Sequence, residues 1–100
     1  MDAKELLQKY AAGEREFLEA ELSGIDLKGA DLTGINLYNA NLSGSELDEA
    51  IFTKANLDGA NFSRASLLGT NLIGVTGYSV NFSFADLSGA DLSMANVSGA

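Results

Sequence analysis

A repeat with a period of five residues runs through this chain from Ala20 to Gly99. A representative unit is Ala30-Asp31-Leu32-Thr33-Gly34, whose third residue is its centre. Sixteen such units follow one another without an insertion, and a fixed period outweighs residue propensities as a guide to the fold. The centres are Leu22, Leu27, Leu32, Leu37, Leu42, Leu47, Phe52, Leu57, Phe62, Leu67, Leu72, Gly77, Phe82, Leu87, Leu92 and Val97.

The period of five excludes both regular elements as the sole building block. A helix turns about 100° per residue, so residues five apart would spiral over every face. In a strand the side-chain period is two, so residues five apart would point to opposite sides. The period fits a short extended piece followed by a corner. The first residue of the unit, which is Ala in ten units, and the centre then point inward. The second residue, which is Asn or Asp in eleven units, points outward. The fifth residue, which is Gly in nine units, supplies the corner. The repeat therefore predicts a solenoid whose coils stack roughly 4.8 Å apart.

The tandem pattern A(D/N)LxG resembles that of the pentapeptide repeat proteins, over residues 20–99. The resemblance implies an all-β fold, a right-handed quadrilateral β-helix with four units per coil, in which residue n stacks on residue n+20. It also implies about four coils, 20–39, 40–59, 60–79 and 80–99, within a single domain. A short helical N-terminal cap resembles that of cyanobacterial members. In this register Asn41, Asn61 and Asn81 are expected to form an amide ladder beneath Glu21.

Residues 2–12 are predicted to form a helix with one apolar stripe. Asp2 suits the N-cap, with Glu5 three residues later, and Gly13 suits the position after the helix. We expect this helix to cover the first coil as a lid; the alternative is an amphipathic helix for a membrane or a partner. Residues 14–19 lead into the solenoid, with Phe17 as the centre of an imperfect first unit.

Gly77 is the one centre without a large side chain. It is expected to leave a hole beneath Leu57 that Val75 and Val80 partly fill. The alternative is a bulge that displays Tyr78.

Composition excludes most kinds of chemistry. The chain has no Cys and no His, so it lacks thiolate sites and the commonest general base and metal ligand. Its serines have no His to activate them, and no phosphate-binding glycine motif occurs. A formal net charge of −8 argues against direct nucleic-acid binding, and no apolar stretch is long enough for a membrane span. We expect a non-enzymatic protein without a cofactor or metal, and a cytoplasmic location because the start does not resemble a signal peptide.

Two sets of outward residues form the candidate partner surface. The first is acidic and serves either a partner or only solubility: Asp26, Asp31, Glu46, Asp48, Glu49, Asp58, Asp86 and Asp91. The second consists of apolar and aromatic residues at positions usually taken by small or polar ones: Leu68, Ile73, Tyr78, Phe84 and Met94. The first four of these lie on successive faces, which argues against a single flat patch.

The last coil is expected to expose its apolar end and unpaired backbone edge, which invites a partner or a second copy end to end. The sequence thus favours a structural or protein-interaction module of unknown specific role. The alternative, from the resemblance, is an acidic rod that mimics DNA and binds DNA gyrase.

Overall fold

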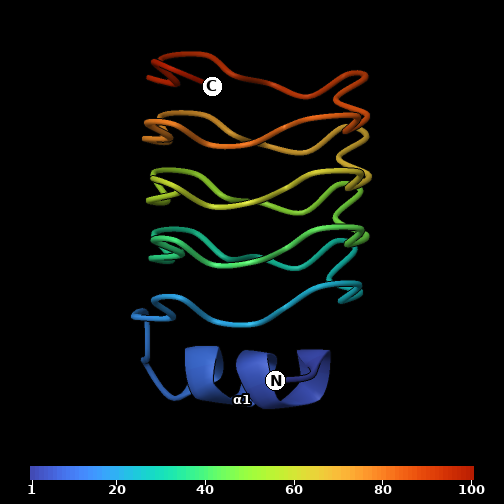
Figure 1. Cartoon of the computed structure of the whole chain (residues 1–100). Coiled ribbons are helices and arrows are strands. Elements are labelled where there is room, and N and C mark those ends of the chain that lie inside the picture. The colour runs from blue at the N-terminus through green and yellow to red at the C-terminus, as the bar shows by residue number, and fades with distance from the viewer.

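The computed structural model describes all residues 1–100 and measures 30 × 21 × 21 Å along its principal axes. One helix, α1 (Ala3–Ala11), is followed by a stack of coils that carries the chain to its C-terminus at the opposite end (Figure 1).

The coils stack in a single register. Parallel backbone bridges join each second-position residue to the one 20 positions later, from Glu16 with Asn36 to Thr76 with Asn96. Since the units have five residues, each coil has four sides. We number the sides by their bridging residues. Side 1 carries residues 16, 36, 56, 76 and 96; side 2 carries 21, 41, 61 and 81; side 3 carries 26, 46, 66 and 86; and side 4 carries 31, 51, 71 and 91.

The sides contain isolated bridges and no continuous strands, which refines the all-β expectation. The reason is the short unit: a turn follows each bridge before a second residue can pair. In the turn after Leu22, the N–H of Ile25 donates to the Leu22 carbonyl over 3.1 Å, and Gly24 has a φ of +70°. Positive φ at the third turn residue is the geometry of a type II turn. The same left-handed conformation occurs at eight non-glycine residues: Glu19, Asn39, Glu49, Lys54, Arg64, Ser79, Phe84 and Met94.

The core consists of the inward columns predicted from the repeat. Centres such as Leu32, Leu47 and Leu67 are fully buried, and first-position residues such as Ala50 close the space between them. The rings of Phe62 and Phe82 stack with centroids 5.7 Å apart, as expected from the register. A fully buried Leu or Phe contributes roughly 1.5–3 kcal/mol, so these columns are the main stabilising contribution.

Helix α1 lies across the end of the first coil, in the position of the predicted lid (Figure 1). The N–H of Glu5 donates to the Asp2 carboxylate over 2.8 Å, and Gly13, with a φ of +101°, follows the C-cap. Leu6 is fully buried against the coil, and the Tyr10 hydroxyl donates to the Thr33 carbonyl over 2.7 Å. The helix thus covers apolar side chains and satisfies a carbonyl of the first coil.

The solenoid begins one unit earlier than residue 20. The N–H of Phe17 donates to the Asn36 carbonyl over 2.9 Å, and the Phe17 side chain is buried. Residues 15–19 are therefore a fifth layer on side 1, which confirms the interpretation of Phe17 as a first centre.

Gly77 is accommodated by repacking. A Cβ at Gly77 would lie 3.2 Å from a methyl of Val80 and 3.3 Å from a methyl of Val97, so these side chains occupy the space. The backbone bonds from Gly77 to Asn96 and from Ser79 to Ser98 continue the ladder. The alternative of a bulge at Tyr78 is therefore wrong.

Candidate interaction surfaces

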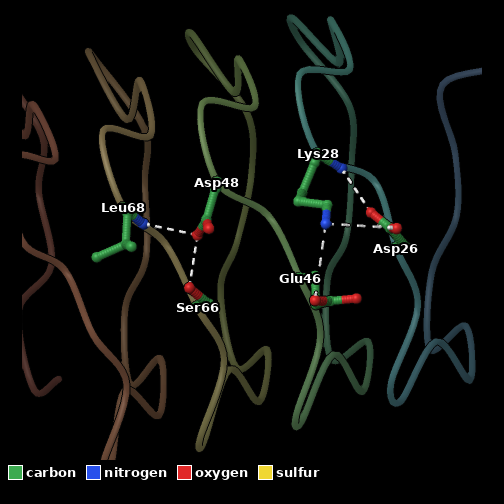
Figure 2. Close-up of polar contacts among 6 residues, drawn as sticks. All are labelled: Asp26, Lys28, Glu46, Asp48, Ser66 and Leu68. Carbon is green, nitrogen blue, oxygen red and sulfur yellow. Dashed lines mark hydrogen bonds and ion pairs between the residues drawn. The ribbon is translucent and has the colours of Figure 1, made fainter.

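The carboxylates concentrate on side 3 and its corner. Of the nine acidic residues between positions 21 and 100, five lie there: Asp26, Glu46, Asp48, Glu49 and Asp86. Lys28 is the single basic residue on this side. Figure 2 shows Asp26 and Lys28 on one coil, Glu46 and Asp48 on the next, and Ser66 and Leu68 on the coil after that. Most carboxylates between positions 21 and 100 therefore lie on one side, because residues 20 positions apart in the sequence stack on one another.

Lys28 partly neutralises this side. Its Nζ lies 3.9 Å from a carboxylate oxygen of Asp26 and 3.8 Å from one of Glu46, as the dashed lines in Figure 2 show. All three side chains are about half exposed, and such ion pairs contribute only about 0–1 kcal/mol. Their effect is to relieve the repulsion between two carboxylates that stack on adjacent coils.

Asp48 and Asp58 have a structural role that sequence reasoning missed. In most units the side-chain oxygen of the second-position Asn or Asp accepts from the N–H of the fourth residue, as Asn41 does from Ser43 over 3.0 Å. Ser66 and Thr76 occupy the second position in two units.

In those two units the acceptor comes from the previous coil. Asp48 accepts from the N–H of Leu68 over 3.1 Å and from the Ser66 hydroxyl over 2.5 Å (Figure 2). Asp58 accepts from the N–H of Tyr78 over 2.9 Å. In the sequence each aspartate stands 18 residues before the Ser or Thr at the second position of the unit that lacks an acceptor. This spacing could have revealed the hydrogen bonds between adjacent coils.

Four other carboxylates are stabilised in their ionised form by local hydrogen bonds. Asp31, Asp86 and Asp91 each accept from a hydroxyl and a backbone N–H two residues later, belonging to Thr33, Ser88 and Ser93 respectively. These bonds, the hydroxyl first, lower the pKa of each carboxyl group below its usual range. Glu21 has a lowered pKa because of bonds with Ser23 and Asn41.

The amide ladder expected on side 2 forms only in part. Asn41 donates to the Glu21 carboxylate over 3.0 Å. The side-chain oxygens of Asn61 and Asn81 accept from the N–H of Ser63 and Ser83, as that of Asn41 does from Ser43, but their amide NH₂ groups donate to no residue of the neighbouring coil. The backbone bridges of this column are nevertheless those that were predicted.

The apolar candidates do not form one patch. Leu68 lies on side 3, Ile73 on side 4 and Tyr78 on side 1, where the Tyr78 hydroxyl accepts from Asn96 over 2.9 Å. Phe84 and Met94 occupy corners of the last coil and are 84% and 91% exposed. The Arg64 guanidinium carbon lies 5.1 Å from the centroid of the Phe84 ring.

The last coil presents the most distinctive surface. Its centres Phe82, Leu87 and Val97 are only partly buried, and Leu92 is 38% exposed. Eight of its backbone N–H groups make no hydrogen bond within the chain, in contrast to their counterparts in the inner coils. They belong to Phe82, Phe84, Leu87, Gly89, Leu92, Met94, Val97 and Gly99.

A pocket of about 490 Å³ opens at one place on this edge. It lies on side 2, next to the position where the last unit stacks on side 1. Its lining residues are Ser79, Val80, Asn81, Phe82, Ser83, Gly99 and Ala100.

No group of three or more acidic side chains converges closely enough to hold a metal ion. Helix α1 is too short and too polar to cross a membrane.

A four-sided solenoid with five-residue units and an n+20 register defines the class of this protein. A family model for pentapeptide repeats matches eight copies over residues 20–59 and 55–93, and the chain belongs to that family. Its members form right-handed quadrilateral β-helices. No curated protein matches the chain significantly.

Solved structures of pentapeptide repeat proteins have the same fold. The chain is similar to alr5209 of Nostoc PCC 7120, with 35% identity and a TM-score of 0.87 over 89% of this chain and 74% of that one. It is also similar to HetL of the same strain, a protein involved in regulating heterocyst differentiation, with 30% identity and a TM-score of 0.76 over 93% of this chain and 48% of HetL. A pentapeptide repeat protein of the Arabidopsis thaliana thylakoid lumen is 25% identical, with a TM-score of 0.63 over 82% of this chain and 68% of that one.

Proposed function

We propose that this protein is a non-enzymatic interaction module that binds a protein partner, or a second copy, through the edge of its last coil. The observation that carries the proposal is the row of unpaired N–H groups above partly buried apolar centres, from Phe82 to Gly99. Unpaired edges bind other polypeptide chains readily, because main-chain hydrogen bonds supply affinity. Pentapeptide repeat proteins are generally structural or interaction modules, which agrees with this proposal.

The opposite end of the solenoid does not offer such an edge. There α1 buries Leu6 against the first coil, and Tyr10 binds the Thr33 carbonyl. The Arg15 guanidinium packs on the Tyr10 ring, 3.7 Å from its centroid, and donates to the Tyr10 carbonyl. These contacts hold the lid in place and direct association toward the other end.

Site-specific photo-cross-linking in extracts of the source cells tests this proposal. A photoreactive residue would replace Phe84 or Met94, the two exposed corner residues of the last coil. Matched controls would carry it at Ser43 on side 2 and at Glu49 beside side 3. We expect both end positions to cross-link the same partner and both controls to miss it. Cross-links from Glu49 alone would place the interaction on the acidic side and contradict the proposal.

The acidic surface supports a second candidate function, binding to DNA gyrase as a mimic of DNA. Its basis is the concentration of carboxylates on side 3 and its corner, where Asp26, Glu46, Asp48, Glu49 and Asp86 lie. A supercoiling assay with and without a quinolone tests it. The control is a variant with Asp26→Asn, Glu46→Gln and Asp86→Asn. Gyrase activity that is unchanged by the protein would exclude this function.

A further inference from the structure

Three exposed apolar side chains share one column on side 1. Leu18, Tyr38 and Tyr78 all occupy the fourth position of their units, 20 or 40 residues apart, and each is nearly half exposed. Asp58 takes the same position in the coil between the two tyrosines. Because adjacent coils lie about 4.8 Å apart, the aspartate has an exposed tyrosine as its direct neighbour on each side along the column.

The carboxylate of Asp58 is fixed in place, but only half of it is used. One oxygen accepts from the N–H of Tyr78 over 2.9 Å, which attaches the carboxylate to the next coil. The other oxygen accepts no hydrogen bond within the chain, and the three ion pairs of the protein do not include Asp58. Asp58 therefore presents a charged acceptor that no cation of the chain neutralises.

Asp48 has the same local structure in a different setting. It accepts from the N–H of Leu68 in the next coil, as Asp58 does from Tyr78, but the residue before it in its column is Lys28 (Figure 2). The units of side 1 contain no basic residue from position 35 onward. The carboxylate on side 1 is thus flanked by aromatic rings and lacks a local cation, so its surroundings are complementary to a positive charge.

The Tyr78 side chain lies along the surface of the solenoid. Its hydroxyl accepts from the amide of Asn96 in the following coil over 2.9 Å, while its backbone N–H binds Asp58. The ring is therefore held at both ends, next to the carboxylate and partly exposed. The face of an aromatic ring attracts cations, so one cation can contact the ring and the free oxygen of Asp58 together.

A guanidinium group fits this arrangement better than an ammonium group. It is planar, it stacks on aromatic rings, and it donates several hydrogen bonds in its own plane, whereas an ammonium is a strongly hydrated point charge. Both arginines of this chain already pack on aromatic rings: the guanidinium carbons of Arg15 and Arg64 lie 3.7 Å and 5.1 Å from the ring centroids of Tyr10 and Phe84. The column on side 1 is left for a guanidinium from another molecule.

We propose that side 1 carries a binding site for an arginine side chain of a partner polypeptide, formed by Asp58 and the rings of Tyr38 and Tyr78. The carboxylate forms a charge-assisted hydrogen bond with the guanidinium, and the rings add cation–π contacts. This site goes beyond the proposed function, because it lies along the length of the rod and away from the edge of the last coil.

NMR titration of the purified ¹⁵N-labelled protein tests the proposal. The probe is the capped peptide acetyl-Ala-Ala-Arg-Ala-Ala-amide, and the control peptide has citrulline in place of Arg, which keeps the shape of the side chain without its charge. We expect the arginine peptide to cause saturable shifts of the amide signals of Tyr38, Asp58 and Tyr78. The citrulline peptide should bind about tenfold more weakly or less well still. An equal response to citrulline would mean that side 1 binds an uncharged group and would overturn the proposal.

Three protein variants separate this site from the general negative charge of the molecule. Asp58→Asn keeps an acceptor for the Tyr78 N–H, so it should retain the fold and weaken binding about tenfold or more. Asp48→Asn is the matched control and should leave the response of side 1 unchanged. Tyr38→Leu keeps an apolar side chain and should weaken binding about two- to fivefold. Shifts that persist in Asp58→Asn, or that disappear equally in Asp48→Asn, would overturn the proposal.

The outcome is distinguishable from that of the proposed function. The peptide is added to the purified protein, so the titration does not depend on a partner at the last coil. If Tyr38, Asp58 and Tyr78 do not respond while Phe84 and Met94 still cross-link a partner, the arginine site is rejected and the proposed function stands. A response on side 1 without cross-links from the last coil would support the arginine site and reject the proposed function.

Discussion

The carboxylate of Asp48 accepts a hydrogen bond from the backbone N–H of Leu68, 3.1 Å away in the next coil. It replaces the oxygen that an Asn or Asp at position 66 would supply, because the serine there is too short to reach this N–H. We expect Asp48→Ala to lower the free energy of unfolding by about 1–2 kcal/mol. Ser66→Asn in the same chain should restore most of the loss. Urea denaturation of the four combinations measures this coupling, with Glu49→Gln as the exposed control.

A buried hydroxyl supports a prediction of increased stability. Ser45 is 1% exposed, and its Oγ has no hydrogen-bond partner. Ala occupies this first position in most units, so Ser45→Ala removes an unpaired polar group without changing the packing. We expect the free energy of unfolding to rise by about 1 kcal/mol.

Thr70 provides the matched control, because it is equally buried and its hydroxyl donates to the Leu47 carbonyl over 2.9 Å. Thr70→Val should therefore be neutral or destabilising in the same thermal denaturation experiment. A gain in stability for Thr70→Val as large as that for Ser45→Ala would contradict this explanation.

The corners predict opposite effects for two substitutions. Gly44 has a φ of +66° with no atom within 4 Å of an added Cβ, so Gly44→Ala introduces backbone strain alone. It should cost about 1 kcal/mol. Met94 has a φ of +59° and is 91% exposed, so Met94→Gly relieves strain without loss of packing. We expect a gain of up to about 1 kcal/mol, reduced by the flexibility of glycine in the unfolded chain. Chemical denaturation checks both signs.

Asp31 predicts a dependence of stability on pH. Its pKa is lower in the folded chain, because the Thr33 hydroxyl and N–H stabilise the carboxylate. The corresponding stability is present above the unfolded pKa of about 3.9 and is lost as pH falls through the lower folded value. Asp31→Asn keeps an acceptor for Thr33 but does not titrate. The stability of the original chain relative to this variant should therefore decrease between pH 7 and pH 2. A difference independent of pH would exclude this linkage.

The packing around Gly77 predicts a coupling between two substitutions. Val80 is 2% exposed, and its methyl would lie 3.2 Å from a Cβ at Gly77. Val80→Ala should create a cavity and cost about 2 kcal/mol. Gly77→Ala alone should also be destabilising, because its methyl would crowd Val80 and Val97. The double variant should lose less than the sum of the two, as a double-mutant cycle would show. Simple additivity would mean that the two sites do not share this space.

The period of five was sufficient to predict most of the fold. Neither a helix nor a strand can keep residues five positions apart on one face. The repeat therefore predicted inward centres such as Leu67, outward residues such as Asn61 and glycine corners such as Gly34. The n+20 register, implied by the family resemblance, then placed Phe62 on Phe82. The lid also followed from sequence, since Asp2, Glu5 and Gly13 mark the ends of a short helix with an apolar stripe.

The candidate surface was less predictable. Asp48 and Asp58 were interpreted as exposed charges, whereas in the structure they accept backbone hydrogen bonds from the next coil. This role arises because the units stacked on them have Ser66 or Thr76 at the second position and so lack an Asn or Asp acceptor of their own. It therefore becomes visible only when the sequences of two adjacent coils are compared. The amide ladder likewise depends on the acceptor in the adjacent coil: Asn41 donates to the Glu21 carboxylate, whereas the side-chain oxygens of Asn41 and Asn61 already accept from the N–H of Ser43 and Ser63.

The register of residue n on residue n+20 determines how such a rod can change in length. Insertion or deletion of twenty residues would lengthen or shorten the molecule while leaving every column continuous across the junction. A change of five residues would preserve the core but rotate everything beyond it by a quarter turn. Asp86 would then no longer share a side with Asp26 and Glu46. In this architecture, adding or removing complete coils of twenty residues changes the length of the rod and keeps its surface pattern. Adding or removing single units of five residues changes which residues share a side.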